Sequence, residues 1–162
     1  MSTEEPKGQS QDLEQSHNQA DSQAVGLVAN GSAGSWEIAV DETISGAAKW
    51  FAQIEGPQVY IYFEILSPKM IDQTIGFIER HTDADQVLPP GLATQSGSLC
   101  LGTFGRLPIA LVWDDEDRNR WFFVIGQTVQ PTVRITILDG DLDEFTQALR
   151  QVREDLKGED LL

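Results

Sequence analysis

The sequence has little of the residue types that metal and disulfide sites require. It holds one cysteine, Cys100, and two histidines, of which only His81 lies beyond the N-terminal segment. A single cysteine excludes an intramolecular disulfide and a CxxC zinc site. Because Cys100 lies between Leu99 and Leu101, we expect it to be buried as a small apolar residue. We expect no bound metal and no cofactor, and for His81 a structural role at the end of a helix.

Basic residues and long apolar runs are also scarce. The chain has 11 Lys and Arg against 26 Asp and Glu, a net charge of −15, and no basic stripe. Binding to nucleic acid or to an anionic membrane needs such a stripe, so we expect neither. No apolar run reaches the roughly 18 residues of a membrane span, and the acidic start is unlike a secretory signal. These absences predict a reduced cytoplasmic protein, and the acidity favours a partner protein with a basic surface.

Composition divides the chain into three parts. Residues 1–34 are rich in Gln, Ser and acids and hold few large apolar side chains, so we expect a disordered tail. Residues 35–157 carry the patterns of a folded region, which we predict to be a single domain with halves at 35–81 and 98–157. Residues 158–162 are predicted to form a short acidic C-terminal tail.

The folded part nearly repeats itself. Residues 49–54 match residues 120–125, and residues 59–63 match residues 133–137 in their apolar positions. Each set leads to a segment with apolar residues at helical spacing. We predict an α+β fold built as an internal pseudo-repeat of βββα, the second copy with an extra leading strand. The short connections predict a mainly antiparallel sheet with two helices packed on it.

Both predicted helices have start signals. Ser67 is expected to accept a hydrogen bond from a free N–H, and Pro68 suits the first helical position. Asp141 and Glu144 form a capping-box pattern before the strongest apolar stripe of the chain, and Gly158 ends it. The acids around Asp141 also resemble the front of a calcium loop, but Glu144 stands where that loop needs glycine, so capping explains them better.

The predicted order of elements, with the small size, the acidity and the final amphipathic helix, is similar to that of type III secretion chaperones. The similarity covers most of residues 35–157, is one of topology and rests on no motif residue. A resemblance of this kind implies a chaperone-like architecture, and fold alone does not fix function.

One set of candidate binding residues lies on the predicted open face of the sheet. Tyr60, Tyr62 and Glu64 alternate with the apolar residues of their strand, and Arg134 holds an outward position on a later one. Exposed aromatic patches often mark interfaces, although a wet sheet face explains the pattern equally well. We predict that these four residues form an interaction surface.

A second candidate set is an acidic hairpin tip. Asp114, Asp115, Glu116 and Asp117 form the densest acidic run of the chain. A solvated tip explains such a run best, and contact with the basic surface of a partner is the functional alternative.

No catalytic motif is recognisable, so we expect no enzyme. The leading hypothesis is a non-enzymatic protein-interaction module of the adaptor, chaperone-like or inhibitor type, either monomer or homodimer. The alternative is a small-molecule binder or enzyme that uses the cleft between the two halves, with the loop 82–97 as a lid and Arg106 as an anion contact. A weaker alternative is an acidic mimic of nucleic acid, which needs its acids in rows on one face.

Overall fold

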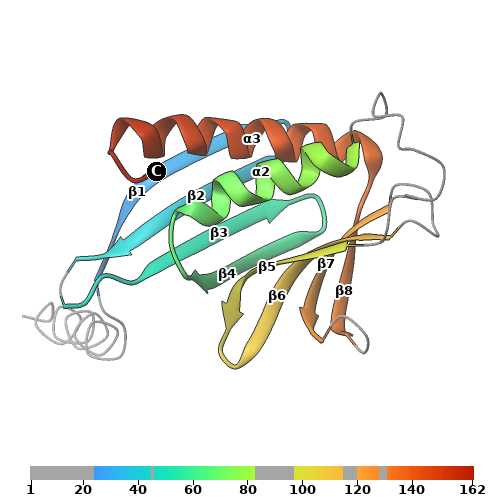
Figure 1. Cartoon of the computed structure of the whole chain (residues 1–162), viewed down its shortest axis with the longest axis horizontal. Coiled ribbons are helices and arrows are strands. Elements are labelled where there is room, and N and C mark those ends of the chain that lie inside the picture. The colour runs from blue at the N-terminus through green and yellow to red at the C-terminus, as the bar shows by residue number, and fades with distance from the viewer. Residues whose placement is uncertain (1–23, 45, 83–96, 115–119, 128–130) are drawn as a thin grey trace, which may run out of the picture.

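The computed structural model describes residues 24–44, 46–82, 97–114, 120–127 and 131–162. Within these ranges, four strands and a helix are followed by another four strands and a helix (Figure 1). The elements are β1 (Val25–Ala33), β2 (Trp36–Thr43), β3 (Trp50–Gly56), β4 (Val59–Ile65), α2 (Lys69–Thr82), β5 (Gly97–Phe104), β6 (Leu107–Asp114), β7 (Arg120–Gly126), β8 (Pro131–Ile137) and α3 (Asp139–Gly158).

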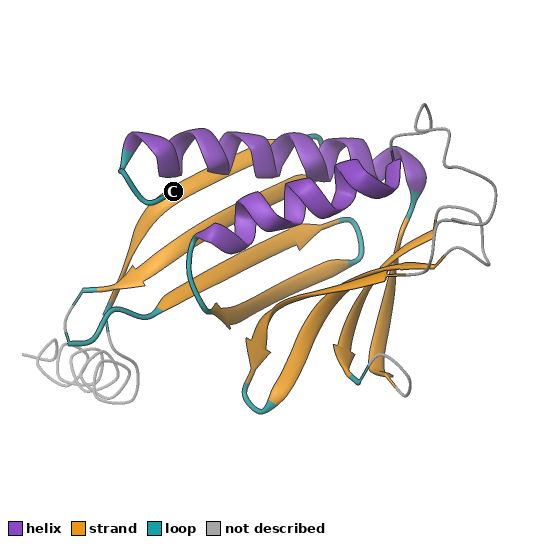
Figure 2. Cartoon of the chain, viewed as in Figure 1, coloured by secondary structure: helices purple, strands orange, loops and turns teal. Residues whose placement is uncertain are grey.

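All strands belong to one antiparallel sheet in which spatial order follows chain order from β1 to β8. The prediction of an α+β fold with a mainly antiparallel sheet and two helices is confirmed. Both helices lie side by side over the same face of the sheet, as Figure 2 shows. The residue-level pseudo-repeat is not tested by this order of elements and stays a prediction.

The sheet changes direction between its two sets of four strands. Neighbouring strands elsewhere pair through six to eight residues each, whereas β4 and β5 share the single pair Glu64 and Thr103. In Figure 1, β5 to β8 turn away from the direction of β1 to β4. Gly102 permits this junction, because a Cβ there would collide with the carbonyl oxygen of Glu64.

Strand β1 corrects the predicted tail. Residues 25–33 belong to the sheet, whereas we expected residues 1–34 to form a disordered segment. Its buried positions, Ala29 and Gly31, are small because α3 lies directly on the strand, and a Cβ at Gly31 would collide with the backbone of that helix. The rest of the predicted tail, residues 1–23, lies outside the described residues. At the other end, the predicted tail 158–162 is partly fixed, because Leu161 packs against the core.

The two helices begin differently. The cap at Ser67 is confirmed, since its Oγ accepts a hydrogen bond from the Lys69 N–H at 3.2 Å. The cap predicted at Asp141 is wrong. Helix α3 begins at Asp139, and its N-cap residue Leu138 makes no side-chain cap hydrogen bond. The carbonyl oxygen of Leu138 instead accepts the N–H groups of Asp141 and Leu142 at 2.9 and 3.0 Å.

The core lies between the helices and the sheet and is rich in aromatic rings. Trp36 packs on Phe145 and Phe123, with ring centroids 4.7 and 6.3 Å apart. His81 lies against Trp113 and Trp121, at 4.9 and 6.0 Å. Its Nδ1 lies 2.9 Å from the carbonyl oxygen of Phe77, one turn earlier in α2. The ring of His81 is therefore held by packing at the end of α2.

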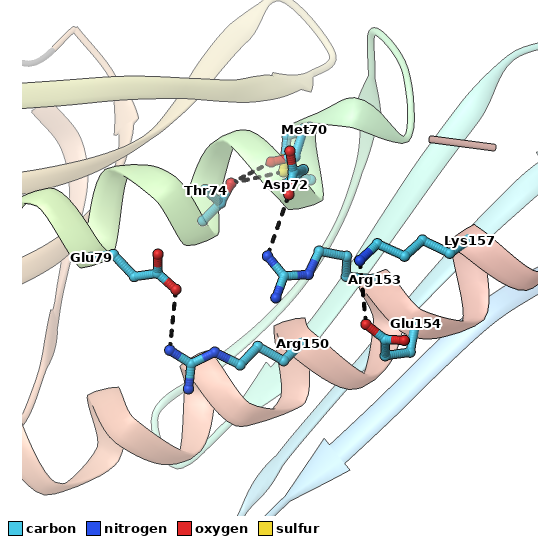
Figure 3. A network of polar contacts seen from close by, with 8 residues as sticks. All are labelled: Met70, Asp72, Thr74, Glu79, Arg150, Arg153, Glu154 and Lys157. Carbon is cyan, nitrogen blue, oxygen red and sulfur yellow. Dashed lines mark hydrogen bonds and ion pairs between the residues drawn. The ribbon is translucent and has the colours of Figure 1, made fainter.

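Ion pairs join the outer faces of the two helices (Figure 3). Arg150 of α3 pairs with Glu79 of α2 at 3.2 Å, and Arg153 pairs with Asp72 at 3.4 Å. Such exposed pairs stabilise a fold by only about 0.2–1 kcal/mol each. Their larger effect is on charge, because they place two of the few cations on the helix side of the molecule.

No helix within the described ranges is long and apolar enough to span a bilayer.

Candidate functional site

The face of β2, β3 and β4 that points away from the two helices carries a regular array of side chains. The strand register sets Glu37 opposite Glu55 and Glu55 opposite Tyr60, which makes the first of three rows. We define the acidic–aromatic face by the nine residues of these rows, which are Glu37, Glu55 and Tyr60, then Ala39, Gln53 and Tyr62, then Asp41, Phe51 and Glu64. The nine include four carboxylates, three aromatic rings and no lysine or arginine.

One aromatic pair on this face is held rigidly. Phe51 and Tyr62 stack with ring centroids 5.5 Å apart and planes within 7°. The Tyr62 hydroxyl donates a hydrogen bond to Asp41 Oδ2 at 3.2 Å. Partial burial, followed by the charge of Asp41 and this hydrogen bond, raises the pKa of Tyr62 to about 12. Tyr60 is 66% exposed and forms the free aromatic surface of the face.

Among the described residues, no lysine or arginine forms an ion pair with the acids of this face. Glu37 and Glu55 are direct cross-strand partners, an arrangement in which like charges are destabilising. The side-chain carboxylates of Glu37, Glu55 and Glu64 form no ion pair or hydrogen bond with any residue that the structure describes. The face therefore concentrates negative potential beside aromatic rings.

A polar hollow opens on the β1 side of this face. It has a volume of about 270 Å³, and Ala39 is among its lining residues. Four other lining residues, Asn30, Ser32, Glu37 and Gln53, carry hydroxyl, carboxamide and carboxylate groups. The remaining lining residues are Gly31, Ile38 and Gln151. One carboxylate among several neutral acceptors suits a guanidinium or ammonium group.

The predicted residues Tyr60, Tyr62 and Glu64 lie together on this face, but Arg134 does not join them. β5, β6 and β7 separate β8 from β4 in the sheet. The Arg134 guanidinium lies 3.7 Å from the centroid of the Phe122 ring and pairs with Asp114 at 3.6 Å. Arg134 thus covers a buried aromatic side chain and neutralises one acid of its own half of the sheet.

The acidic hairpin is described only at its base. Asp114 is the last residue of β6 and is partly buried beside Arg134. Asp115, Glu116 and Asp117 lie outside the described residues, so the binding role predicted for this hairpin stays a prediction.

A second pocket, of about 490 Å³, opens where β4 meets β5. We call it the seam pocket and define it by Ala48, Lys49, Trp50, Glu64, Ile65, Leu66, Cys100, Gly102 and Thr103. Arg106, the predicted anion contact of a cleft, is exposed in the β5–β6 turn and is not among these residues. Of the predicted lid 82–97, residues 83–96 lie outside the described part of the chain.

Cys100 is exposed, so the expectation that it is buried is wrong. Leu101 turns into the core, and the alternation of the strand sends Cys100 to the opposite face. Among the described residues, no group of three His, Cys, Asp or Glu side chains could hold a metal ion.

Sequence analysis missed most of the acidic–aromatic face. Glu37, Asp41, Phe51, Gln53 and Glu55 were not among the predicted site residues. Their outward positions follow from the same alternation that singled out Tyr60 and Tyr62. Their cross-strand partners depend on register, which the sequence does not reveal.

A scan of protein-family models and searches of curated proteins and of solved structures found no match to this chain. The resemblance to type III secretion chaperones therefore stays a prediction.

Proposed function

We propose that this protein is a non-enzymatic interaction module that binds a basic segment of a partner protein on its acidic–aromatic face. The observation that carries the proposal is the row of Glu37, Glu55 and Tyr60, where two carboxylates face each other beside an exposed ring and pair with no cation of the described residues. An arrangement that destabilises the free sheet becomes favourable once arginine or lysine side chains lie across it.

The chemistry of the face suits such a segment. Carboxylates accept charge-assisted hydrogen bonds from guanidinium groups, and aromatic rings attract cations to their faces. The stacked pair of Phe51 and Tyr62 is pre-ordered, so little rotamer entropy is lost there on binding. The net charge of −15 would also speed the encounter with a basic partner.

A direct test measures the affinity of a short fluorescent peptide of alternating Arg and Gly by anisotropy. We expect wild type to bind it and Glu37→Lys/Glu55→Lys to lose roughly tenfold or more in affinity. The matched control is Asp143→Lys/Glu159→Lys, which changes the net charge equally at exposed positions of α3 and beyond it. Equal losses in the two variants would mean unspecific attraction and would refute the proposed face.

A capture experiment from lysate tests the aromatic part of the face. We expect Tyr60→Ala/Tyr62→Ala to lose a partner that wild type and the α3 control variant retain. Retention of the same partner by all three proteins would exclude the tyrosines from binding.

One observation favours the alternative of a small-molecule site. The seam pocket has the volume of a ligand site, about 300–1,000 Å³ in most proteins. It holds no catalytic set that we recognise. The nucleic-acid mimic has less support, because described acids such as Asp72, Glu79 and Glu154 lie on the helix side while others lie on the open sheet face.

Three finer expectations belong to the same proposal. The pseudo-repeat of βββα stays a proposal, and the leading strand predicted for the second copy alone has a counterpart in the first half, β1. The protein is expected to act in the cytoplasm and to be a monomer or a homodimer.

A further inference from the structure

We propose that the seam pocket holds a bulky apolar side chain of the same basic segment that binds the acidic–aromatic face. This inference rests on the proposed function, and it adds a sequence requirement for the partner. The segment would combine arginine or lysine residues with one aromatic or branched aliphatic residue.

The pocket and the face are continuous. Glu64 belongs to both, since it lines the pocket and is the direct cross-strand partner of Phe51. Leu66, the first residue after β4, lines the same pocket and is almost fully exposed. A segment crossing β2, β3 and β4 along the row of Asp41, Phe51 and Glu64 would reach the pocket next.

The acidic–aromatic face and the seam pocket differ in charge, and therefore in the side chains that they favour. The nine residues of the face carry four carboxylates and no cation, whereas the rim of the pocket carries one of each, Glu64 and Lys49. The Lys49 ammonium forms no ion pair with the described residues. A near-neutral rim does not favour a second basic side chain over an uncharged one, while the apolar walls favour an apolar group.

The walls of the pocket are largely apolar and already exposed. Leu66 is 97% exposed and Trp50 is half-buried, and both line the opening. A leucine this exposed gains from being covered, because burial of apolar surface is favourable in proportion to its area. The volume of about 490 Å³ is sufficient for one large side chain.

The pocket is built into the fold rather than opened by a ligand. β4 and β5 share only the pair Glu64 and Thr103, so the strands diverge beside that point. The tight contact at Gly102 fixes the junction. A preformed pocket on rigid strands can select side chains by size.

The test compares two fluorescent peptides of alternating Arg and Gly, one of which carries a terminal Trp in place of Gly. Affinity is measured by anisotropy. Occupancy of the pocket is measured by the rate at which Cys100, the only thiol of the chain, reacts with a neutral disulfide reagent. We expect the Trp peptide to bind roughly tenfold tighter and to slow the reaction of Cys100 at saturation, while the Gly peptide leaves that rate unchanged.

A surface variant makes the assignment specific. Leu66→Ser should remove most of the preference for Trp and keep binding of the Gly peptide. Leu138→Ala, at another exposed leucine, should leave the preference intact. Because both side chains are exposed, neither substitution should impair folding.

The outcomes separate this inference from the proposed function. Equal affinity of the two peptides with unprotected Cys100 would overturn the pocket and leave the face standing. Binding of neither peptide to wild type would overturn both. Protection of Cys100 by N-acetyltryptophanamide but by neither peptide would overturn the inference in favour of a small-molecule site.

Discussion

At the scale of single residues, Tyr62 is the most constrained side chain of the open face. Its ring stacks on Phe51 and its hydroxyl is bound to Asp41, so it is fixed at both ends. The same contacts disfavour its ionised form. Its titration therefore reports directly on the integrity of the face.

We predict that one of the two tyrosines of the chain ionises at about pH 12 in the folded protein. Asp41→Asn should move that transition towards the ordinary value of 10, because a neighbouring charge is removed. Phenolate absorbance measured against pH gives the titration curves of wild type and of Asp41→Asn. Tyr62→Phe should abolish the transition near pH 12. A late transition that survives in Tyr62→Phe would contradict the assignment.

The same shift predicts how stability depends on pH. The folded state holds a proton that the unfolded state loses above pH 10, so this contribution to stability is full below pH 10 and is lost between pH 10 and about 12. Urea unfolding across this window should show a weaker decline for Tyr62→Phe than for wild type. Equal declines in the free energy of unfolding of the two proteins would show that groups other than Tyr62 determine the pH dependence of stability.

A substitution at Glu55 tests whether the acids of the face lower the stability of the fold while they strengthen binding of a basic segment. Glu55→Thr removes a like charge opposite Glu37 and should raise the free energy of unfolding by about 0.2–1 kcal/mol while weakening binding of the Arg–Gly peptide. Glu64→Thr is the matched control, because Glu64 faces Phe51 rather than an acid. Chemical denaturation of both variants measures the two free energies of unfolding. A lower free energy of unfolding in Glu55→Thr would contradict the proposal that Glu55 destabilises the free sheet.

At the scale of elements, α3 and β1 form the closest pairing of helix and strand. Gly31 lets the helix approach, and the side chains of Gln151 and Asp155 accept hydrogen bonds from the Ser32 and Asn30 N–H groups at 2.9 and 3.1 Å. The helix thus covers the outer edge of the sheet. These two hydrogen bonds occupy donors that an added strand would need, which disfavours strand addition at this part of the edge.

Gly31→Ala should lower the free energy of unfolding by about 1–3 kcal/mol, since a Cβ has no space beneath α3. Gly140→Ala, inside the same helix and with open space around it, should be neutral or stabilising by up to about 1 kcal/mol. Thermal or urea unfolding measures both. A mild effect at Gly31 would mean that the helix can shift.

Part of this arrangement could be predicted from the sequence. Alternating apolar residues predicted seven of the eight strands, and Ser67 predicted the start of α2. β1 was missed because its buried positions are the small residues Ala29 and Gly31, which give no apolar pattern, and because its partner α3 lies more than a hundred residues away. The acidic–aromatic face was found only on β4, since its other members depend on strand register. Arg134 was misplaced because sequence shows which face a residue occupies but not how many strands intervene.

At the scale of the whole molecule, the positions of the cations decide which surface stays negative. Arg150 and Arg153 pair with acids of α2, and Arg134 pairs with Asp114 on the far strands. The face of β2, β3 and β4 is left negative. Salt should therefore act oppositely on folding and on binding.

We predict that raising salt from about 10 to about 150 mM increases the free energy of unfolding, because it screens repulsion among the 26 acids. The same change should weaken binding of the Arg–Gly peptide several-fold. Unfolding curves and anisotropy at matched salt measure the two effects. A stability that falls with salt would show that the ion pairs between the helices outweigh the net repulsion.

The pairing of β1 with α3 has a consequence for how the chain is made. Synthesis completes the first strand long before the helix that covers it, and Asn30 must wait for Asp155, which lies 125 residues later. Until then, the edge of β1 is open to any neighbouring chain. Ribosome-bound chains that stop before α3 should therefore need chaperone protection, and packing of α3 on β1 should make the nascent protein more resistant to aggregation.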